Sequence, residues 1–219
     1  LVGIGNSDNT GTLNEPGNQI GGFEMSYRRP IGRSGHALRL SFEAIGEDAD
    51  NIVIEQFARQ IGVSLLGPAG DSGGSYLAGV EFADTLGQRF LGSLQGGNLY
   101  IGSIYNHFIY TDGWTYGRRP MGFSVDGDSR MLTVHGSVTD TSSRRWYASY
   151  RHVDLNLYAY PRYRISKTHE KIHLVTAGVD WPTRIGDLRV EGRVQKNGPD
   201  TPDSSPWRLQ GEVGWTSRF

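Results

Sequence analysis

The chain has 219 residues, and its 22 Lys and Arg nearly balance its 23 Asp and Glu, so the formal net charge is -1. This balance leaves no basic field for nucleic acid, and the length allows one large all-β unit or two small domains. Cysteine is absent, which excludes disulfide scaffolds and thiolate zinc sites. No apolar run approaches the roughly 20 residues of a transmembrane helix. Because residue 1 is Leu and no leader-like segment opens the chain, we expect a fragment or domain of a longer protein.

Alternation of apolar and polar residues, typical of strands, recurs along the chain. Leu38, Leu40 and Phe42 alternate with polar residues early in the chain. The last segment shows the pattern best, since Trp207 and Trp215 share their parity with other apolar side chains up to the terminal residue. Nine strands are predicted, near residues 20–29, 36–46, 57–67, 76–87, 129–139, 144–153, 171–181, 187–196 and 206–219.

The connections between these strands alternate in length. Residues 30–35, 68–75, 140–143 and 182–186 form short connections, whereas residues 48–56, 88–128, 154–170 and 197–206 form longer ones. A soluble sandwich would show the same alternation of side chains, but short turns on one side and long loops on the other are typical of an outer-membrane β-barrel. The sequence therefore predicts an all-β, antiparallel up-and-down transmembrane β-barrel with its short turns in the periplasm.

This reading assigns side chains to two faces. The side chains predicted to face lipid are Phe42, Val134, Val190 and Trp215, and those predicted to face the lumen are Arg39, Thr133, Arg189 and Glu212. Further charged residues predicted to face the lumen are Arg28, Arg145, Arg151, Arg193, Arg208, Glu24, Glu43 and Glu191. Aromatic residues near strand ends, as an interfacial belt requires, are Tyr76, Trp146, Tyr150, Trp181, Trp207 and Trp215.

Five short motifs, in order, carry a resemblance to a known family. They are Pro16-Gly17-Asn18-Gln19 with Gly22, Gly46-Glu47-Asp48, Glu81-Phe82-Ala83-Asp84-Thr85, the segment from Tyr105 to Gly122, and Asp126-Gly127-Asp128-Ser129. Together with the aromatic C-terminal strand, they make the chain resemble the Wzi-type capsule-assembly proteins over most of residues 15–219.

The resemblance implies a non-catalytic, lectin-like outer-membrane protein of a Gram-negative bacterium that anchors capsular polysaccharide or exopolysaccharide to the cell surface. Family members look like barrels of about eighteen strands, so this chain would be the C-terminal half. Residues 1–18 would then be an extracellular loop leading in, and residues 19–219 the C-terminal part of the barrel. The partners implied are polysaccharide, outer-membrane lipid and, through the strand that ends in Phe219, the barrel-assembly machinery. No cofactor, metal, catalytic residue or nucleic acid is expected.

Sugar binding uses aromatic rings against apolar sugar faces and Arg against hydroxyl and carboxylate groups. The long loops hold ten candidates, namely Tyr110, Trp114, Tyr116, Arg118, Arg119, Tyr158, Tyr160, Arg162, Tyr163 and Arg164. Packing of these side chains onto the barrel rim is the alternative. We expect the loop 88–128 to fold back over or into the barrel mouth, because structureless loops of this length are uncommon unless functional. An outer-membrane pore for solute or polysaccharide is the alternative function.

Three motifs resemble enzyme or metal sites. Gly70-Asp71-Ser72-Gly73-Gly74 spells a protease nucleophile loop, but the only histidine before it is His36, at a strand start without the context of a catalytic base. His169-Glu170-Lys171-Ile172-His173 matches HExxH, which clamps zinc only on a helix, whereas here a strand pattern follows. The pairs Glu47/Asp48 and Asp126/Asp128 are interpreted as turns. We expect Ser72, His169 and His173 to be dispensable.

Overall fold

A computed structural model describes residues 20–32, 34–48, 54–70, 73–88, 99–106, 115–116, 119–120, 123–199, 201 and 206–217. Twelve strands lie in these ranges: β1 (Ile20–Ile31), β2 (His36–Asp48), β3 (Ile54–Ala69), β4 (Gly74–Gln88), β5 (Leu99–Tyr100), β6 (Thr115–Tyr116), β7 (Arg119–Pro120), β8 (Arg130–Thr139), β9 (Arg145–Leu155), β10 (Glu170–Pro182), β11 (Gly186–Lys196) and β12 (Trp207–Ser217). Among the described residues, no helix is long and apolar enough to cross a membrane.

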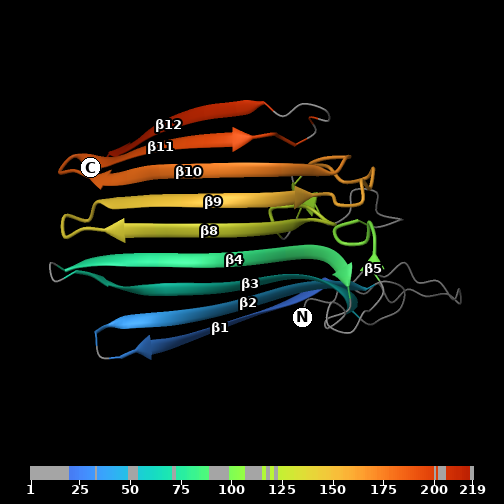
Figure 1. Ribbon diagram of the computed structural model, residues 1–219, viewed down its shortest axis with the longest axis horizontal. Helices are drawn as coiled ribbons and strands as arrows, with labels where there is room; N and C mark the ends of the chain where they lie inside the picture. Colours follow the sequence, from blue (N-terminus) through green and yellow to red (C-terminus); the bar gives the residue numbers. More distant parts are fainter. Residues whose placement is uncertain are drawn as a thin grey trace, which may run out of the picture.

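Ten of the strands form one antiparallel sheet. The order is β1-β2-β3-β4-β8-β9-β10-β11-β12, with β5 added to the end of β4, so each long strand pairs with its neighbour along the chain (Figure 1). β6 and β7 form a separate two-stranded hairpin. The predicted nine-strand up-and-down meander is therefore confirmed, and a Greek-key sandwich is excluded for the described residues.

The strands differ from the predicted ranges mainly at the long connections. β3 begins at Ile54 because β2 and β3 continue to pair beyond an irregularity between Glu47 and Asp48. A second register shift lies between Phe57 and Arg59 in the pairing of β3 with β4. Such irregularities break the period-two pattern, so sequence alternation does not reveal the paired residues beyond them.

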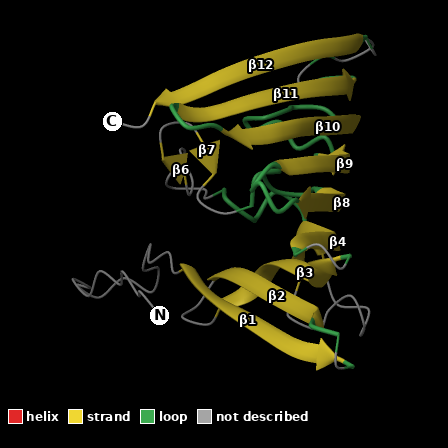
Figure 2. Ribbon diagram, turned by 90° about the vertical axis from the view of Figure 1, so that its left-hand side faces the viewer, coloured by secondary structure: helices red, strands yellow, loops and turns green. Residues whose placement is uncertain are grey.

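The sheet is strongly curved and has two open edges. Viewed from the end that carries the short turns, it has the shape of part of a barrel wall, with β1 and β12 at the edges (Figure 2). The four connections predicted to be short lie at one end, and the four predicted to be long lie at the other (Figure 1). The β2–β3 connection is shorter than predicted, because residues 49–53 are no more numerous than residues 140–144 of the β8–β9 turn. This separation follows from nearest-neighbour antiparallel pairing, and it places the long loops together.

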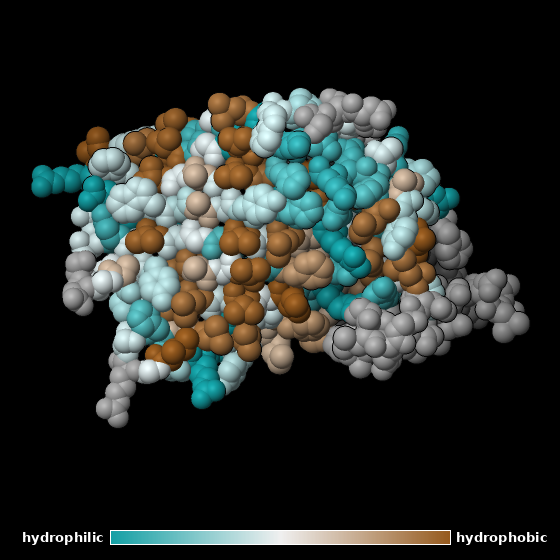
Figure 3. Space-filling model, viewed as in Figure 1, coloured by the Kyte–Doolittle hydropathy of each residue, from teal (hydrophilic) through white to brown (hydrophobic). Residues whose placement is uncertain are grey.

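Cross-strand registers separate an apolar face from a polar one. Val63 pairs with Val80, Val80 with Val134, and Val134 with Tyr150, and this row continues through Val175, Val194 and Leu209. Figure 3 shows hydrophobic side chains gathered over the strands on this face. Because the loops lie on the concave side, the exposed apolar face is the convex one.

The eight residues predicted to divide between the two faces do so. Phe42, Val134, Val190 and Trp215 share the parity of the convex rows, and Arg39, Thr133, Arg189 and Glu212 have the opposite parity. The period of two residues along each strand thus carries directly into a two-faced sheet.

Candidate functional site

Two of the long connections fold back onto the concave face of the sheet. We define the loop plug as the described residues 99–106, 123–129 and 156–168. Its first two segments belong to the connection between β4 and β8, and its third connects β9 to β10. The folding back predicted for the loop 88–128 is therefore seen in its described residues. The β6–β7 hairpin from the same connection also lies on the concave side (Figure 2).

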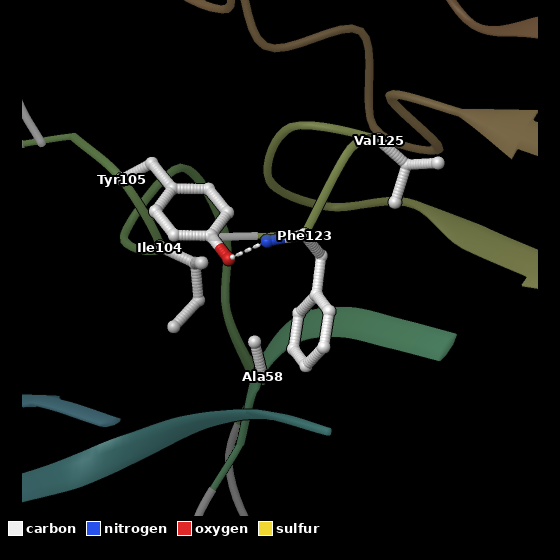
Figure 4. Packing of buried hydrophobic residues seen from close by; sticks show 5 residues of the cluster. All are labelled: Ala58, Ile104, Tyr105, Phe123 and Val125. Atoms are coloured by element: carbon white, nitrogen blue, oxygen red, sulfur yellow. Dashed lines mark hydrogen bonds between the residues drawn. The ribbon is translucent and has the colours of Figure 1, made fainter. Parts of the chain in front are cut away.

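A buried apolar cluster attaches the plug to the sheet. Ala58 of β3 lies against Ile104, Tyr105, Phe123 and Val125, with Ile45, Met131 and Val153 packed around them. Figure 4 shows the Tyr105 ring beside Phe123, whose backbone N–H donates a 2.8 Å hydrogen bond to the Tyr105 hydroxyl. Tyr105 has a positive φ of 64°, so the loop accepts backbone strain to bury this ring. The cluster covers apolar concave positions of the sheet that would otherwise contact water.

The end of β4 is joined to the plug through Thr85, which is fully buried. Its hydroxyl donates to the carbonyl of Asp126 at 2.6 Å and accepts from the Ser129 N–H at 3.0 Å. Backbone bonds from Thr85 N–H to Ser129 and from Asp128 N–H to Thr85 flank this contact. Two motifs that carry the family resemblance, residues 81–85 and 126–129, therefore meet in space although about forty residues separate them.

Two carboxylates organise the plug from inside. Asp126 accepts hydrogen bonds from the backbone N–H groups of Gly127, Arg164 and Ile165, at 3.0, 3.0 and 3.3 Å. Asp128 accepts one from Gly102 N–H at 2.8 Å. Burial raises the pKa of Asp128 to about 6, although the Gly102 N–H favours the charged form. Both residues have positive φ, as expected from the turn interpretation.

Asn156 and Glu170 hold the third segment of the plug. The Asn156 side chain donates to the carbonyls of Tyr160 and Ser166 at 2.9 and 3.0 Å and accepts from Tyr160 N–H at 2.8 Å. The buried Glu170 carboxylate accepts from the Ser166 hydroxyl at 2.6 Å and from Thr201 N–H at 3.2 Å. Sequence patterns missed these roles, because hydrogen bonds between loops leave no periodic signal.

The predicted sugar-binding residues fall into four groups, of which the last, Tyr160 and Tyr163, is buried or partly buried. Tyr158, Arg162 and Arg164 are exposed on the third segment of the plug, with Tyr158 at 44% exposure. Tyr116 and Arg119 lie in the β6–β7 hairpin, of which only the backbone is described. Tyr110, Trp114 and Arg118 lie outside the described residues.

Tyr160 and Tyr163 have packing roles. Their rings meet edge to face at a centroid distance of 5.3 Å, and Tyr163 is only 2% exposed. A Cβ on Gly102 or Gly127 would collide with these rings, so glycine at both positions lets the backbone pass close to them. Burial, together with the nearby Asp128 and Asp126 carboxylates, raises the pKa of Tyr163, which therefore stays protonated. The protein itself covers Tyr163, so a surface polysaccharide does not reach its ring.

The concave wall from β9 to β12 is internally paired. Arg189 Nε lies 2.7 Å from Asp180 Oδ1, and Arg145 lies 3.7 Å from the other oxygen of the same carboxylate. Arg193 Nε lies 2.6 Å from Glu191, which also accepts a 2.8 Å hydrogen bond from the Tyr147 hydroxyl. The charges predicted to face the lumen are therefore largely neutralised along this part of the wall.

The HExxH match is explained by local structure. β10 begins at Glu170, so the HExxH match lies where a loop enters a strand, and the Glu170 carboxylate is occupied by loop hydrogen bonds. Ser72 lies outside the described residues. Within the part of the chain that the structure describes, no three His, Asp or Glu side chains are grouped to hold a metal ion.

Comparison with known proteins bears on this arrangement. The family model for the capsule assembly protein Wzi matches residues 1–205. The chain belongs to this family. Among solved structures, Wzi from Escherichia coli matches with a TM-score of 0.60 at 16% sequence identity, over 90% of this chain and 52% of that one. That Wzi is described as a carbohydrate-binding β-barrel and an outer membrane protein involved in group 1 capsule assembly. No curated protein sequence matches the chain.

The match to Wzi explains the open sheet. Since this chain spans about half the length of the Wzi structure, its curved meander corresponds to part of a β-barrel. The fold predicted from the sequence, an all-β antiparallel barrel wall, is confirmed by this match together with the described strands.

Proposed function

We propose that the chain is the C-terminal half of an outer-membrane β-barrel that holds capsular polysaccharide or exopolysaccharide at the cell surface without catalysis. The observation that carries this proposal is the loop plug. It is a rigidly tied pair of loops at one end of the barrel wall that exposes an aromatic ring and two arginines. Membership of the Wzi family supports the same role.

The convex apolar band supports placement in a membrane. β8 has ten residues, and after Arg130 its positions on this face are Leu132, Val134, Gly136 and Val138. Ten residues at about 3.3 Å each span about 33 Å, which is about 25 Å of height at a strand tilt of about 40°. This height matches the apolar band of outer-membrane barrels.

Aromatic residues at the short-turn end support the same placement. Trp146 and Trp181 lie on the convex face, 46% and 47% exposed, and the Arg144 guanidinium lies 5.7 and 5.4 Å from their ring centroids. Trp215 is a further exposed ring on this face. An amphipathic belt of this kind suits a membrane interface. Because short turns face the periplasm in outer-membrane barrels, we expect the plug on the outside of the cell.

The exposed plug residues suit an acidic or hydroxyl-rich polysaccharide. Tyr158 offers a ring face for sugar C–H groups, and Arg162 and Arg164 offer charge-assisted donors to uronate carboxylates and hydroxyls. The hydrogen bonds of Asp126 and Asn156 fix the backbone on both sides of these residues. Pre-ordering lowers the entropy cost of binding a flexible polymer.

Further partners follow from the same placement. Outer-membrane lipid would contact the convex band, and the terminal strand ending in Phe219 would be read by the barrel-assembly machinery. Residues 1–18 would lead in from outside as an extracellular loop, and Tyr110, Trp114, Tyr116, Arg118 and Arg119 would extend the polysaccharide surface.

A binding measurement on the full-length protein tests the proposal. Tyr158→Ala, Arg162→Ala and Arg164→Ala together should weaken binding to the purified surface polysaccharide of the source bacterium about tenfold or more. Arg184→Ala, an exposed arginine in the short turn between β10 and β11, is the matched control and should leave binding unchanged. Equal affinity of the triple variant and the unaltered protein would remove the plug from the binding surface.

A further inference from the structure

A row of charged residues crosses the convex face where the apolar band meets the long loops. Arg59 pairs with Asp84, Asp84 with Arg130, Arg130 with Asp154, and Asp154 with Lys171 in consecutive strand registers. The signs alternate across five strands, and Arg130 Nε lies 3.5 Å from Asp84. On β8, Arg130 of this row directly precedes the apolar convex positions that begin at Leu132. The row therefore marks the boundary of the apolar band on the side of the long loops.

At the β9–β11 end of this row, cationic and imidazole groups outnumber carboxylates. We define the convex basic cluster as His152, His169, Lys171, His173 and Lys196. His152, His173 and Lys196 lie directly opposite one another in register. The rings of His152 and His173 are 4.7 Å apart, and Asp154 lies 3.5 Å from a ring nitrogen of both His152 and His169. Asp154 is the carboxylate at the centre of this group.

Both lysines of the cluster are exposed on a face that the plug does not cover. Lys171 projects on the opposite side of β10 from Glu170, which points into the plug, and Lys196 Nζ lies 5.9 Å from the Trp207 ring centroid. Immediately on the turn side of the cluster, Tyr150, Val175 and Val194 begin the exposed apolar rows. A ligand here would have an anionic group against the lysines and apolar chains running along the strands.

We propose that the convex basic cluster binds the phosphate group of a phosphorylated lipid in the outer leaflet, with the acyl chains lying on the apolar band between β9 and β12. The site is separate from the polysaccharide surface, since it lies on the opposite face of the sheet. The inference rests on the proposed membrane placement but not on polysaccharide binding.

The test uses full-length protein in non-ionic detergent micelles titrated with dansyl-labelled phosphatidic acid, read by energy transfer from tryptophan. Trp207 lies beside Lys196 and serves as the nearby donor. Dansyl-labelled phosphatidylcholine and a dansyl-labelled fatty acid are the neutral and carboxylate comparisons. Phosphatidic acid should half-saturate at a mole fraction about 25-fold below phosphatidylcholine, because each of the two lysines contributes about fivefold. It should also half-saturate well below the fatty acid, because a phosphate offers more charge and more acceptor oxygens than a carboxylate.

Variants that change the charge of the cluster distinguish binding at this site from a general electrostatic attraction between the protein and anionic lipid. Lys171→Gln with Lys196→Gln should weaken phosphatidic acid binding by about fivefold for each lysine, whereas Lys171→Arg with Lys196→Arg should retain it. Lys167→Gln, an exposed loop lysine, is the matched control and should change nothing. Unchanged binding in the double glutamine variant would overturn the proposal.

The comparisons with the fatty acid and with inorganic phosphate identify which anion the cluster binds. If the fatty acid bound as tightly as phosphatidic acid, the cluster would select charge and not phosphate. If inorganic phosphate displaced the lipid better than chloride at equal ionic strength, the site would take free phosphate. Either result contradicts the proposal. A nitroxide at Val134 that stays exposed to oxygen in the double variant would show that membrane placement is intact, so a failure of lipid binding can be told from a failure of the fold.

Discussion

Asp128 is the single residue whose protonation most directly affects the loop plug. Its carboxyl is buried beneath Tyr163 and Gly102, and its pKa of about 6 lies above the ordinary value of 3.8. A raised pKa means that the folded loop binds the proton more tightly than the unfolded chain. The stability from this group is therefore fully present below about pH 4 and is lost as the pH rises through about 6.

We predict that hydrogen-exchange protection of the Gly102 amide, corrected for the intrinsic pH dependence of exchange, falls between pH 4 and pH 7 in the unaltered protein. Asp128→Asn should remove most of this fall, because the amide oxygen still accepts the Gly102 N–H without a charge. Protection that falls equally in both proteins would assign the pH response to another group.

A substitution at Thr85 tests how strongly the end of β4 holds the loop plug. Thr85→Val keeps the shape but removes the hydroxyl contacts to Asp126 and Ser129, at a cost of about 2 kcal/mol for buried partners left unsatisfied. We predict faster trypsin cleavage at Arg162 and Arg164 with the strands intact. Thr139→Val, on the same face at the far end of β8, should have little effect. Unchanged cleavage in Thr85→Val would show that the apolar cluster alone seats the plug.

At the scale of elements, alternation predicted all nine long strands because a strand with one apolar face imposes a period of two on its sequence. The sequence did not predict β5, β6 and β7, which are two residues long and carry no periodic signal. The hydrogen bonds around Thr85 and Ser129 could not be predicted from the sequence either, because they join residues far apart in the chain through backbone groups. Only the motifs of the family resemblance marked its two halves.

The two faces of the sheet can be tested one residue at a time. Nitroxides in place of Phe42, Val134, Val190 and Trp215 should be relaxed mainly by oxygen in membranes, because these positions lie on the convex face. Labels at Arg39, Thr133, Arg189 and Glu212 should show low oxygen exposure. Apolar exposure of the second set would reverse the assigned faces.

At the scale of the whole molecule, the plug and the paired charges of the concave wall favour a closed lumen over an open pore. Deleting residues 89–127 from the full-length protein removes two of the three plug segments and should raise single-channel conductance in planar bilayers while the strands remain folded. Arg184→Ala should conduct as the unaltered protein does. If the deletion left conductance unchanged, the loop between β4 and β8 would not seal the lumen.

Retention of polysaccharide by living cells tests the central claim most directly. Cells that carry full-length protein with Tyr158→Ala, Arg162→Ala and Arg164→Ala should release a larger fraction of their surface polysaccharide into the medium than cells with Arg184→Ala, at equal amounts of protein in the outer membrane. This result is expected because the three side chains are the exposed residues of the described plug that we propose to contact polysaccharide. Full retention by the triple variant, with correct insertion, would contradict the account.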